Sequence, residues 1–183
     1  MNNGLRPTTR LLHALRFAAE QHRDHRRKGA TAAPYINHPI AVAEQLAAHG
    51  HGENIDLLIA AILHDVVEDT DTTGEEIKAE FGDTVGSIVM EVTDDQALPR
   101  SKRKALVVDT IAGKSRAAKL LKLSDLIANL ADLIDHPPHW NDEQKRDYLE
   151  WGEAVVEALR GTHPDLEARF ASLAEKAWIR LGN

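Results

Sequence analysis

The feature that most constrains the fold is an almost unbroken apolar run from Leu57 to Val67, which carries a histidine and an aspartate near its end. A helix that is apolar on most sides is stable only where other elements cover it. We therefore expect this helix to lie at the centre of the protein. Burying His64 and Asp65 at its end costs several kcal/mol unless the two groups are paired or bind a metal ion.

Helical spacing of apolar residues dominates the rest of the chain, and no convincing alternating run predicts a strand. The capping-box spacing of Thr73 and Glu76 predicts a short helix there, and Gly50 with Gly52 predicts a break. We predict an all-α protein, a single bundle of roughly eight to ten helices, with one domain over residues 1–183 and its core at about residues 8–180. Other helices are expected around Leu11–Ala19 with Thr8 or Thr9 as N-cap, from Pro39 to about Ala48, and at Asp83–Val92, Ser101–Ile111, Ser115–Leu133, Asp142–Leu159 and Pro164–Leu181.

With 183 residues, of which 43% are hydrophobic and 28% charged, the chain matches one compact domain of about 100–200 residues. The lack of cysteine excludes disulfides, Cys-ligated metal centres and a thiol nucleophile, and it fits the cytoplasmic location that we expect. No apolar stretch approaches about 18 residues, so neither a membrane span nor a secretory leader is expected. The net charge of −7 argues against nucleic acid as a partner.

Charge is distributed unevenly along the chain. The stretch from His64 to Asp95 holds eleven acidic residues and one lysine, whereas Arg100 to Lys122 holds eight basic residues and one aspartate. A further basic cluster lies at residues 26–28. Acidic and basic blocks in one chain suit a metal ion together with a small polyanion, although solvated helix faces remain the alternative for most single charges.

The acidic end of the apolar run has the spacing of a binding site. His64 and Glu68 are four residues apart, as are Asp65 and Asp69. On a helix each pair stacks on one face at about 5–6 Å. The residues of one helical turn can then bind a cation, while those of the next turn face the molecule that the cation binds. The alternative is a helix whose polar end emerges into solvent.

A divalent ion needs more than the two ligands His64 and Asp65. His38 stands at a predicted helix start, and Asp125 lies in an otherwise apolar helical stretch. Alone, His38 fits a cap or surface position, and Asp125 fits a solvated or salt-bridged one. Together the four make a mixed nitrogen and oxygen set that suits Mn²⁺, Fe²⁺, Co²⁺ or Zn²⁺, with positions left for water.

The ordered set His38, His64-Asp65 and Asp125 resembles the HD superfamily of metal-dependent phosphohydrolases. Longer strings resemble the hydrolase domain of the SpoT/Rel alarmone enzymes: RRK at 26–28, PYINHP at 34–39, HDVVEDTDTT at 64–73 and KLSDLIANL at 122–130. EVTDD at 91–95 and DYLEW at 147–151 are more similar still to the stand-alone small alarmone hydrolases of the metazoan SpoT-homologue type. The resemblance covers about residues 8–180, and a length of 183 residues is expected to leave no room for the synthetase domain of the bifunctional relatives.

The resemblance implies an HD-type enzyme that removes pyrophosphate from the 3′ position of the nucleotide ppGpp with one Mn²⁺ ion per chain. It implies four metal ligands: His38, His64, Asp65 and Asp125. It implies two acidic residues that orient and deprotonate the attacking water: Glu68 and Asp69. It implies three substrate contacts: Arg27, Lys28 and Asn129.

Physical chemistry is consistent with these implied roles. A bound cation lowers the pKa of water and offsets phosphoryl charge, and a nearby carboxylate that takes the proton contributes roughly 10²–10⁴-fold. Arg27 and Lys28 would neutralise a diphosphate, although a solvated loop is the alternative. Tyr148 fits packing better than chemistry. The eight remaining histidines fit surface or cap positions: His13, His22, His25, His49, His51, His136, His139 and His163.

Leu126 and Ala128 depart from the family pattern, which usually has a basic residue and then an aromatic residue or histidine at these positions. Selectivity for ppGpp is therefore open. The same site could act on ppApp or on the phosphate of NADPH, which product analysis would separate. More distant alternatives are an HD nucleotidase, a cyclic-nucleotide phosphodiesterase and a non-catalytic alarmone-binding regulator, the last of which would bind no divalent ion. The sequence predicts no oligomeric state.

Overall fold

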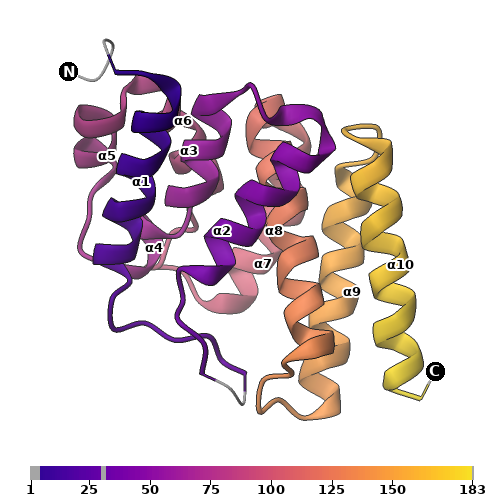
Figure 1. Ribbon diagram of the computed structural model, residues 1–183. Helices are drawn as coiled ribbons and strands as arrows, with labels where there is room; N and C mark the ends of the chain where they lie inside the picture. Colours follow the sequence, from indigo (N-terminus) through magenta and orange to yellow (C-terminus); the bar gives the residue numbers. More distant parts are fainter. Residues whose placement is uncertain (1–4, 30–31, 183) are drawn as a thin grey trace. The chain divides into compact units, whose positions relative to one another are not determined.

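The computed structural model describes residues 5–29 and 32–182, and its regular structure is helical (Figure 1). These residues form ten α-helices, and apart from an isolated bridge between Gly29 and Pro138 they contain no strand. The predicted all-α fold is therefore confirmed. The chain divides into two compact units, residues 1–25 with 34–96 and residues 26–33 with 97–183.

The first unit is built around the apolar run. Its helix α3 (Ile55–Leu63) contacts α1 (Pro7–Gln21), α2 (Asn37–Leu46) and α6 (Asp83–Val92). Every residue of α3 from Leu57 to Leu63 is buried. The predicted central position of this helix is confirmed within its unit, because covering helices remove nearly all of its apolar surface from water.

The central helix ends earlier than its apolar pattern predicts. We expected it to continue to Val67, but α3 ends at Leu63, and a short helix α4 begins at Val66 and ends at Asp69. Asp65 between them has φ −94° and ψ −7°, near the sparsely populated bridge region. Contacts of the polar side chains hold this turn. The apolar pattern predicts only which residues are buried, and it does not predict where the helix ends.

Local signals set the other boundaries in this unit. Thr73 and Glu76 form the predicted reciprocal capping box at the start of α5 (Gly74–Phe81). The prediction of Thr8 or Thr9 as N-cap is wrong, because Pro7 takes the first helical position and Arg6 precedes it. After α2 the chain passes through an irregular π-type turn at Ala47–His51 that contains Gly50 with φ +89°.

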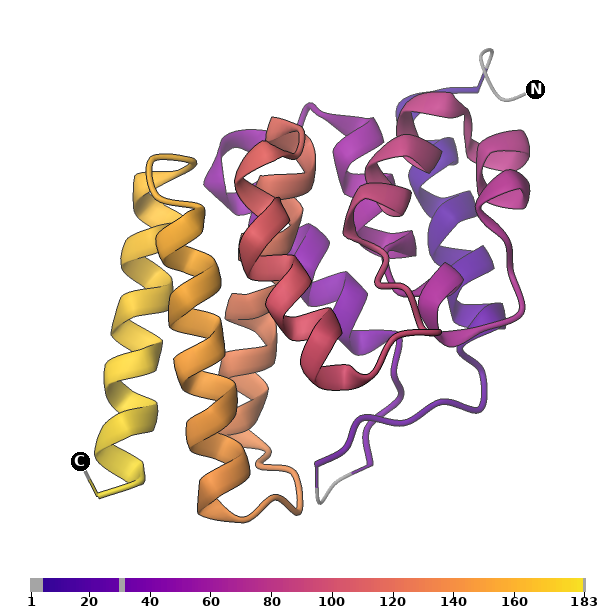
Figure 2. The same cartoon turned by 180° about the vertical axis from the view of Figure 1, so that it is seen from behind.

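The second unit consists mainly of long helices. They are α7 (Arg100–Thr110), α8 (Arg116–Asp135), α9 (Asp142–Ala158) and α10 (Pro164–Arg180), with a 3₁₀ turn at Ile111–Gly113 after α7. Helices α8, α9 and α10 pack against one another, and α7 packs against α9, as Figures 1 and 2 show from opposite sides. The predicted boundaries agree to within one or two residues, which is the ordinary uncertainty of a helix end.

Side-chain caps begin three of the helices in this unit. Ser115 accepts a hydrogen bond from the backbone of Ala118, Asn141 forms a capping box with Gln144, and His163 accepts from the backbone of Leu166. The predicted cap role is thus confirmed for His163. None of the helices in the described part of the chain combines the length and the apolarity needed to cross a bilayer.

Gly82 offers a test of the turn between α5 and α6. Its φ of +96° and ψ of 162° lie in a region that is almost exclusive to glycine. We expect Gly82→Ala to lower the free energy of unfolding by about 1–3 kcal/mol, measured by chemical denaturation. Gly52→Ala is the matched control, because Gly52 has helical φ and its added methyl group would meet no atom closer than 3.7 Å. Equal effects of the two substitutions would contradict strain at Gly82.

Candidate metal centre

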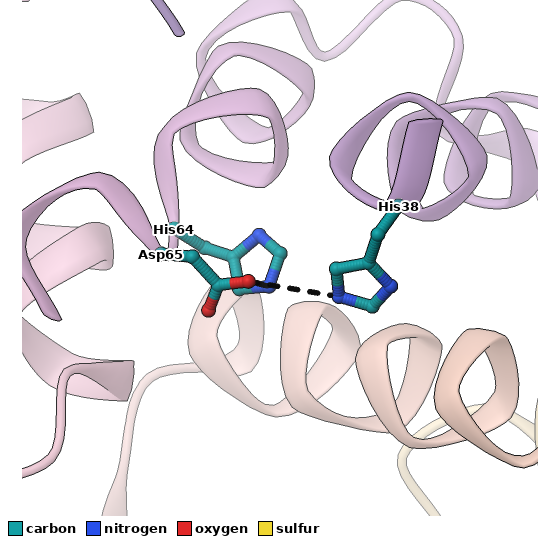
Figure 3. A group of neighbouring side chains, drawn as sticks. All are labelled: His38, His64 and Asp65. Carbon is teal, nitrogen blue, oxygen red and sulfur yellow. Dashed lines mark ion pairs between the residues drawn. The ribbon is translucent and has the colours of Figure 1, made fainter. Parts of the chain in front are cut away.

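Three of the four predicted metal ligands come together within the first unit. His38 is the second residue of α2, and His64 and Asp65 form the turn between α3 and α4. Each offers one ligand atom, and these atoms all lie within 4.8 Å of one another. Figure 3 shows the ring of His38 facing the ring of His64 and the carboxylate of Asp65, which come from another segment. Both histidines are buried, so their nitrogens are withdrawn from bulk water.

One carboxylate oxygen faces both imidazole rings. Oδ2 of Asp65 lies 3.2 Å from Nε2 of His64 and 3.7 Å from Nε2 of His38. The two ring centroids are 5.3 Å apart. Imidazole nitrogen and carboxylate oxygen are the donor types that first-row divalent metals accept. The donor set of these three residues therefore fits a metal ion.

Hydrogen bonding decides which nitrogen of His64 carries its proton. Nδ1 lies 2.8 Å from the backbone oxygen of Ala61. A carbonyl oxygen only accepts, so Nδ1 donates. In the neutral ring Nε2 then presents a lone pair toward the acceptor Oδ2 of Asp65. Two lone pairs at this distance repel each other unless a cation, either a proton or a metal ion, lies between them.

Tyr35 contacts the same carboxylate, although no sequence pattern assigned it a role. Its hydroxyl donates to Oδ2 of Asp65 at 2.6 Å. A carboxylate oxygen has two lone-pair sites, so it can accept this bond and still act as a ligand. The position of Tyr35 three residues before His38 could have identified it, because residues this near in sequence can lie close together. The two rings are 6.0 Å apart.

His22 corrects the expectation of a surface or cap position. Only 2% of this residue is exposed, and its ring packs against Tyr35 at 4.7 Å. Burial lowers the pKa of His22 to about 4, partly opposed by the charge of Asp65. Its Nδ1 lies 3.0 Å from Nδ1 of His25, so one ring donates and the other accepts. His22 is therefore neutral at physiological pH.

The two predicted catalytic carboxylates lie on α4, just after the predicted ligands His64 and Asp65. Oε2 of Glu68 accepts a hydrogen bond from the backbone of Asp94 at 3.1 Å. Asp69 reaches solvent, yet desolvation of its carboxyl group raises its pKa, and the charge of Asp65 raises that pKa further. A hydrogen bond with Tyr35 opposes this shift. A carboxyl group with a raised pKa is the better proton acceptor.

In the second unit, α8 carries two of the predicted site residues, Asp125 and Asn129. Asp125 is 6% exposed, and its oxygens accept hydrogen bonds from Nδ2 of Asn129 at 2.6 Å and from Nζ of Lys122 at 3.0 Å. Oδ1 of Asn129 in turn accepts from Arg27 at 2.7 Å, and Asp132 accepts from Arg27 at 2.8 Å. Arg27, Asn129 and Asp125 are therefore joined in one polar network.

The other residues singled out from the sequence have simple environments. Lys28 is exposed, near the start of the segment 26–33. Leu126 is 1% exposed and belongs to the core, so the position that the family usually fills with a charge is packed with hydrocarbon here. Ala128 is half-buried. The ring of Tyr148 packs at tilted angles against those of Trp140 and Trp151, each with its ring centroid 5.6 Å away, which agrees with the predicted packing role.

Comparison with known proteins identifies the family of this chain. A family model described as an HD domain matches residues 14–146. The chain is 43% identical over 175 residues to guanosine-3′,5′-bis(diphosphate) 3′-pyrophosphohydrolase MESH1 of Danio rerio, which covers 95% of this chain and 97% of that protein. It is 46% identical over 172 residues to the protein of the same name in Homo sapiens, covering 93% and 96%.

The fold is shared with a solved structure of a metazoan orthologue of SpoT, which hydrolyses ppGpp and plays a role in starvation responses. The TM-score is 0.90 at 38% sequence identity, and the match covers 94% of this chain and 98% of that one. Similarity therefore extends along nearly the whole chain in sequence and in structure.

The neutral state of His22 predicts a pH-dependent stability. Its pKa is about 4 in the folded protein and about 6.5 in the unfolded chain, so the unfolded state binds the extra proton as the pH falls. The stabilisation is complete above about pH 6.5 and is lost as the pH falls toward 4. For the metal-free protein, we expect His22 to account for about 2 kcal/mol of the stability lost between about pH 7.5 and pH 5.

Chemical denaturation at the two pH values measures this loss. His22→Phe keeps an aromatic ring against Tyr35 and should lose less stability than the wild type on acidification. His139→Gln is the control, because it removes an exposed histidine and should lose as much as the wild type. An acid-induced loss in His22→Phe that equals the wild-type loss would contradict the prediction.

Proposed function

The chain belongs to the HD-domain family, and from that premise we propose that it hydrolyses guanosine 3′,5′-bis(diphosphate), releasing the 3′-pyrophosphate. The observation that carries the proposal is the extent of the similarity. Relatives named for this reaction match the chain over nearly their full length. The predicted resemblance to the small alarmone hydrolases is thereby confirmed.

We propose that one Mn²⁺ ion is the resident metal and that His38, His64 and Asp65 hold it. The proximity of their ligand atoms and the acceptor–acceptor contact of His64 with Asp65 support this assignment. The bound ion would supply a water of lowered pKa and would offset charge on phosphoryl oxygens. Asp125 remains the predicted fourth ligand. Its burial on α8 and the carboxylate–amide bond with Asn129 support a role in binding.

The remaining steps fall to side chains of this protein. Glu68 orients the attacking water and Asp69 accepts its proton, and the raised pKa of Asp69 supports that role. Arg27 and Lys28 bind the phosphate groups by charge, and Asn129 hydrogen-bonds the nucleotide. The hydrogen bond from Arg27 to Asn129 orients both side chains before substrate arrives. We also propose one HD-type domain over residues 1–183, supported by a family model that takes in residues of both units.

The decisive experiment compares three nucleotides. The purified protein is incubated with ppGpp, ppApp or NADPH, with and without Mn²⁺, and the products are identified. Release of pyrophosphate from ppGpp only in the presence of metal is the expected result. Preference for another nucleotide would change the assigned substrate and leave the assigned metal site unchanged. Failure to bind any divalent ion, together with no turnover of the three nucleotides, would favour an alarmone-binding regulator.

Two neighbouring carboxylates separate metal binding from chemistry. Asp65→Asn removes a predicted ligand, so stoichiometric Mn²⁺ should be lost from the purified protein, as measured by elemental analysis. Glu68→Gln should keep the metal and lower kcat by roughly 10²–10⁴-fold. Full metal content in Asp65→Asn would contradict the ligand assignment. A near-normal kcat in Glu68→Gln would remove that residue from the mechanism.

The basic segment makes a separate prediction about substrate binding. Arg27→Ala should raise KM for ppGpp by roughly 10-fold or more, because a charged hydrogen bond contributes about 1.5–3 kcal/mol. Metal content should not change. Arg26→Ala is the matched control, since Arg26 is an exposed neighbour in the same segment. An equal and small effect of both substitutions would identify the segment as a solvated surface.

A further inference from the structure

The hydroxyl of Tyr35 makes a direct bond to the candidate metal centre that the proposed mechanism does not use. It donates to Oδ2 of Asp65 at 2.6 Å. The same oxygen faces Nε2 of His64 and Nε2 of His38. The tyrosine therefore bonds the atom on which the ligand set converges.

The ring of Tyr35 is fixed on several sides. Its backbone N–H donates to the carbonyl oxygen of His25 at 3.1 Å. Its ring packs against the buried ring of His22 with an interplanar angle of 34° and meets His25 edge-on at 6.2 Å. A ring held in this way keeps its hydroxyl beside Asp65, and the hydroxyl also bonds Asp69.

We propose that Tyr35 is a positioning residue for the metal centre: its hydroxyl holds Asp65 in the rotamer that directs Oδ2 toward His38 and His64. The proposal deepens the proposed function and depends on its assignment of these ligands. Without the hydroxyl, the carboxylate of Asp65 can turn about its side-chain bonds, and part of the binding free energy is then spent on reordering it. Partners that orient a ligand typically change metal affinity by about 10–100-fold.

The chain allows a matched comparison, because it contains two tyrosines. Tyr35→Phe removes the hydroxyl and keeps the ring against His22. Tyr148→Phe is the control, since among the described residues its buried hydroxyl has no hydrogen-bond partner. Metal-free protein is titrated with Co²⁺, and the visible absorption of the bound ion reports both affinity and ligand geometry.

We expect Tyr35→Phe to bind Co²⁺ about 10–100-fold more weakly than the wild type, with an altered absorption band. Tyr148→Phe should match the wild type in both measurements. Wild-type affinity and spectrum in Tyr35→Phe would overturn the proposal, as would equal weakening in both variants. No nucleotide is present, so a failure of the proposed ppGpp hydrolysis would leave this result unchanged and distinguishable.

A second measurement keeps Tyr35 intact, in case Tyr35→Phe does not fold. The Tyr148→Phe protein is labelled with 3-fluorotyrosine, so Tyr35 gives the single ¹⁹F resonance. We expect this resonance to shift when stoichiometric Zn²⁺ binds, because the acceptor of its hydroxyl becomes a metal ligand. A resonance that does not move at full Zn²⁺ occupancy would overturn the proposal.

Discussion

The contact between two acceptors, Nε2 of His64 and Oδ2 of Asp65, determines what the first unit can do. The backbone oxygen of Ala61 fixes the proton on the other nitrogen of His64, so the 3.2 Å approach to Asp65 requires a cation. Neither side chain can leave the contact easily. His64 ends a helix that is buried along its length, and Tyr35 bonds the oxygen of Asp65. The fold thus holds two groups in an arrangement that is unfavourable without a positive charge between them.

The covering of α3 explains how so small a protein maintains this arrangement. Because α1, α2 and α6 all pack on this helix, a shift of its last turn would disturb several apolar contacts at once. The break at Asp65 then begins the short helix α4, which carries Glu68 and Asp69. Burial of α3 keeps the end of this helix rigid.

Much of the fold follows from local signals, and the site follows only in part. Capping at Thr73, helix-forming spacing and the glycine breaks predict element type because each depends on neighbours in the sequence. The end of α3 does not follow from spacing, since it depends on contacts of His64 and Asp65 with side chains of the unit. The burial of His22 was missed for the same reason: it is produced by packing on Tyr35, 13 positions along the sequence. Motif spacing brought His38 into the ligand set, but no pattern indicated which neighbour would orient Asp65.

Leu126 differs from the residue that the family motif has at this position, although Asp125 on the same helix keeps polar partners. The family motif places a charge beside the aspartate of α8, yet here that position is filled by a leucine that is 1% exposed. A buried leucine contributes to packing and cannot reach a phosphate. On the same helix, Lys122 and Asn129 hold the two oxygens of Asp125, and Asn129 also bonds Arg27. The carboxylate therefore keeps polar partners without the missing charge. The absence of a basic neighbour at Leu126 therefore leaves Asp125 supported by Lys122 and Asn129.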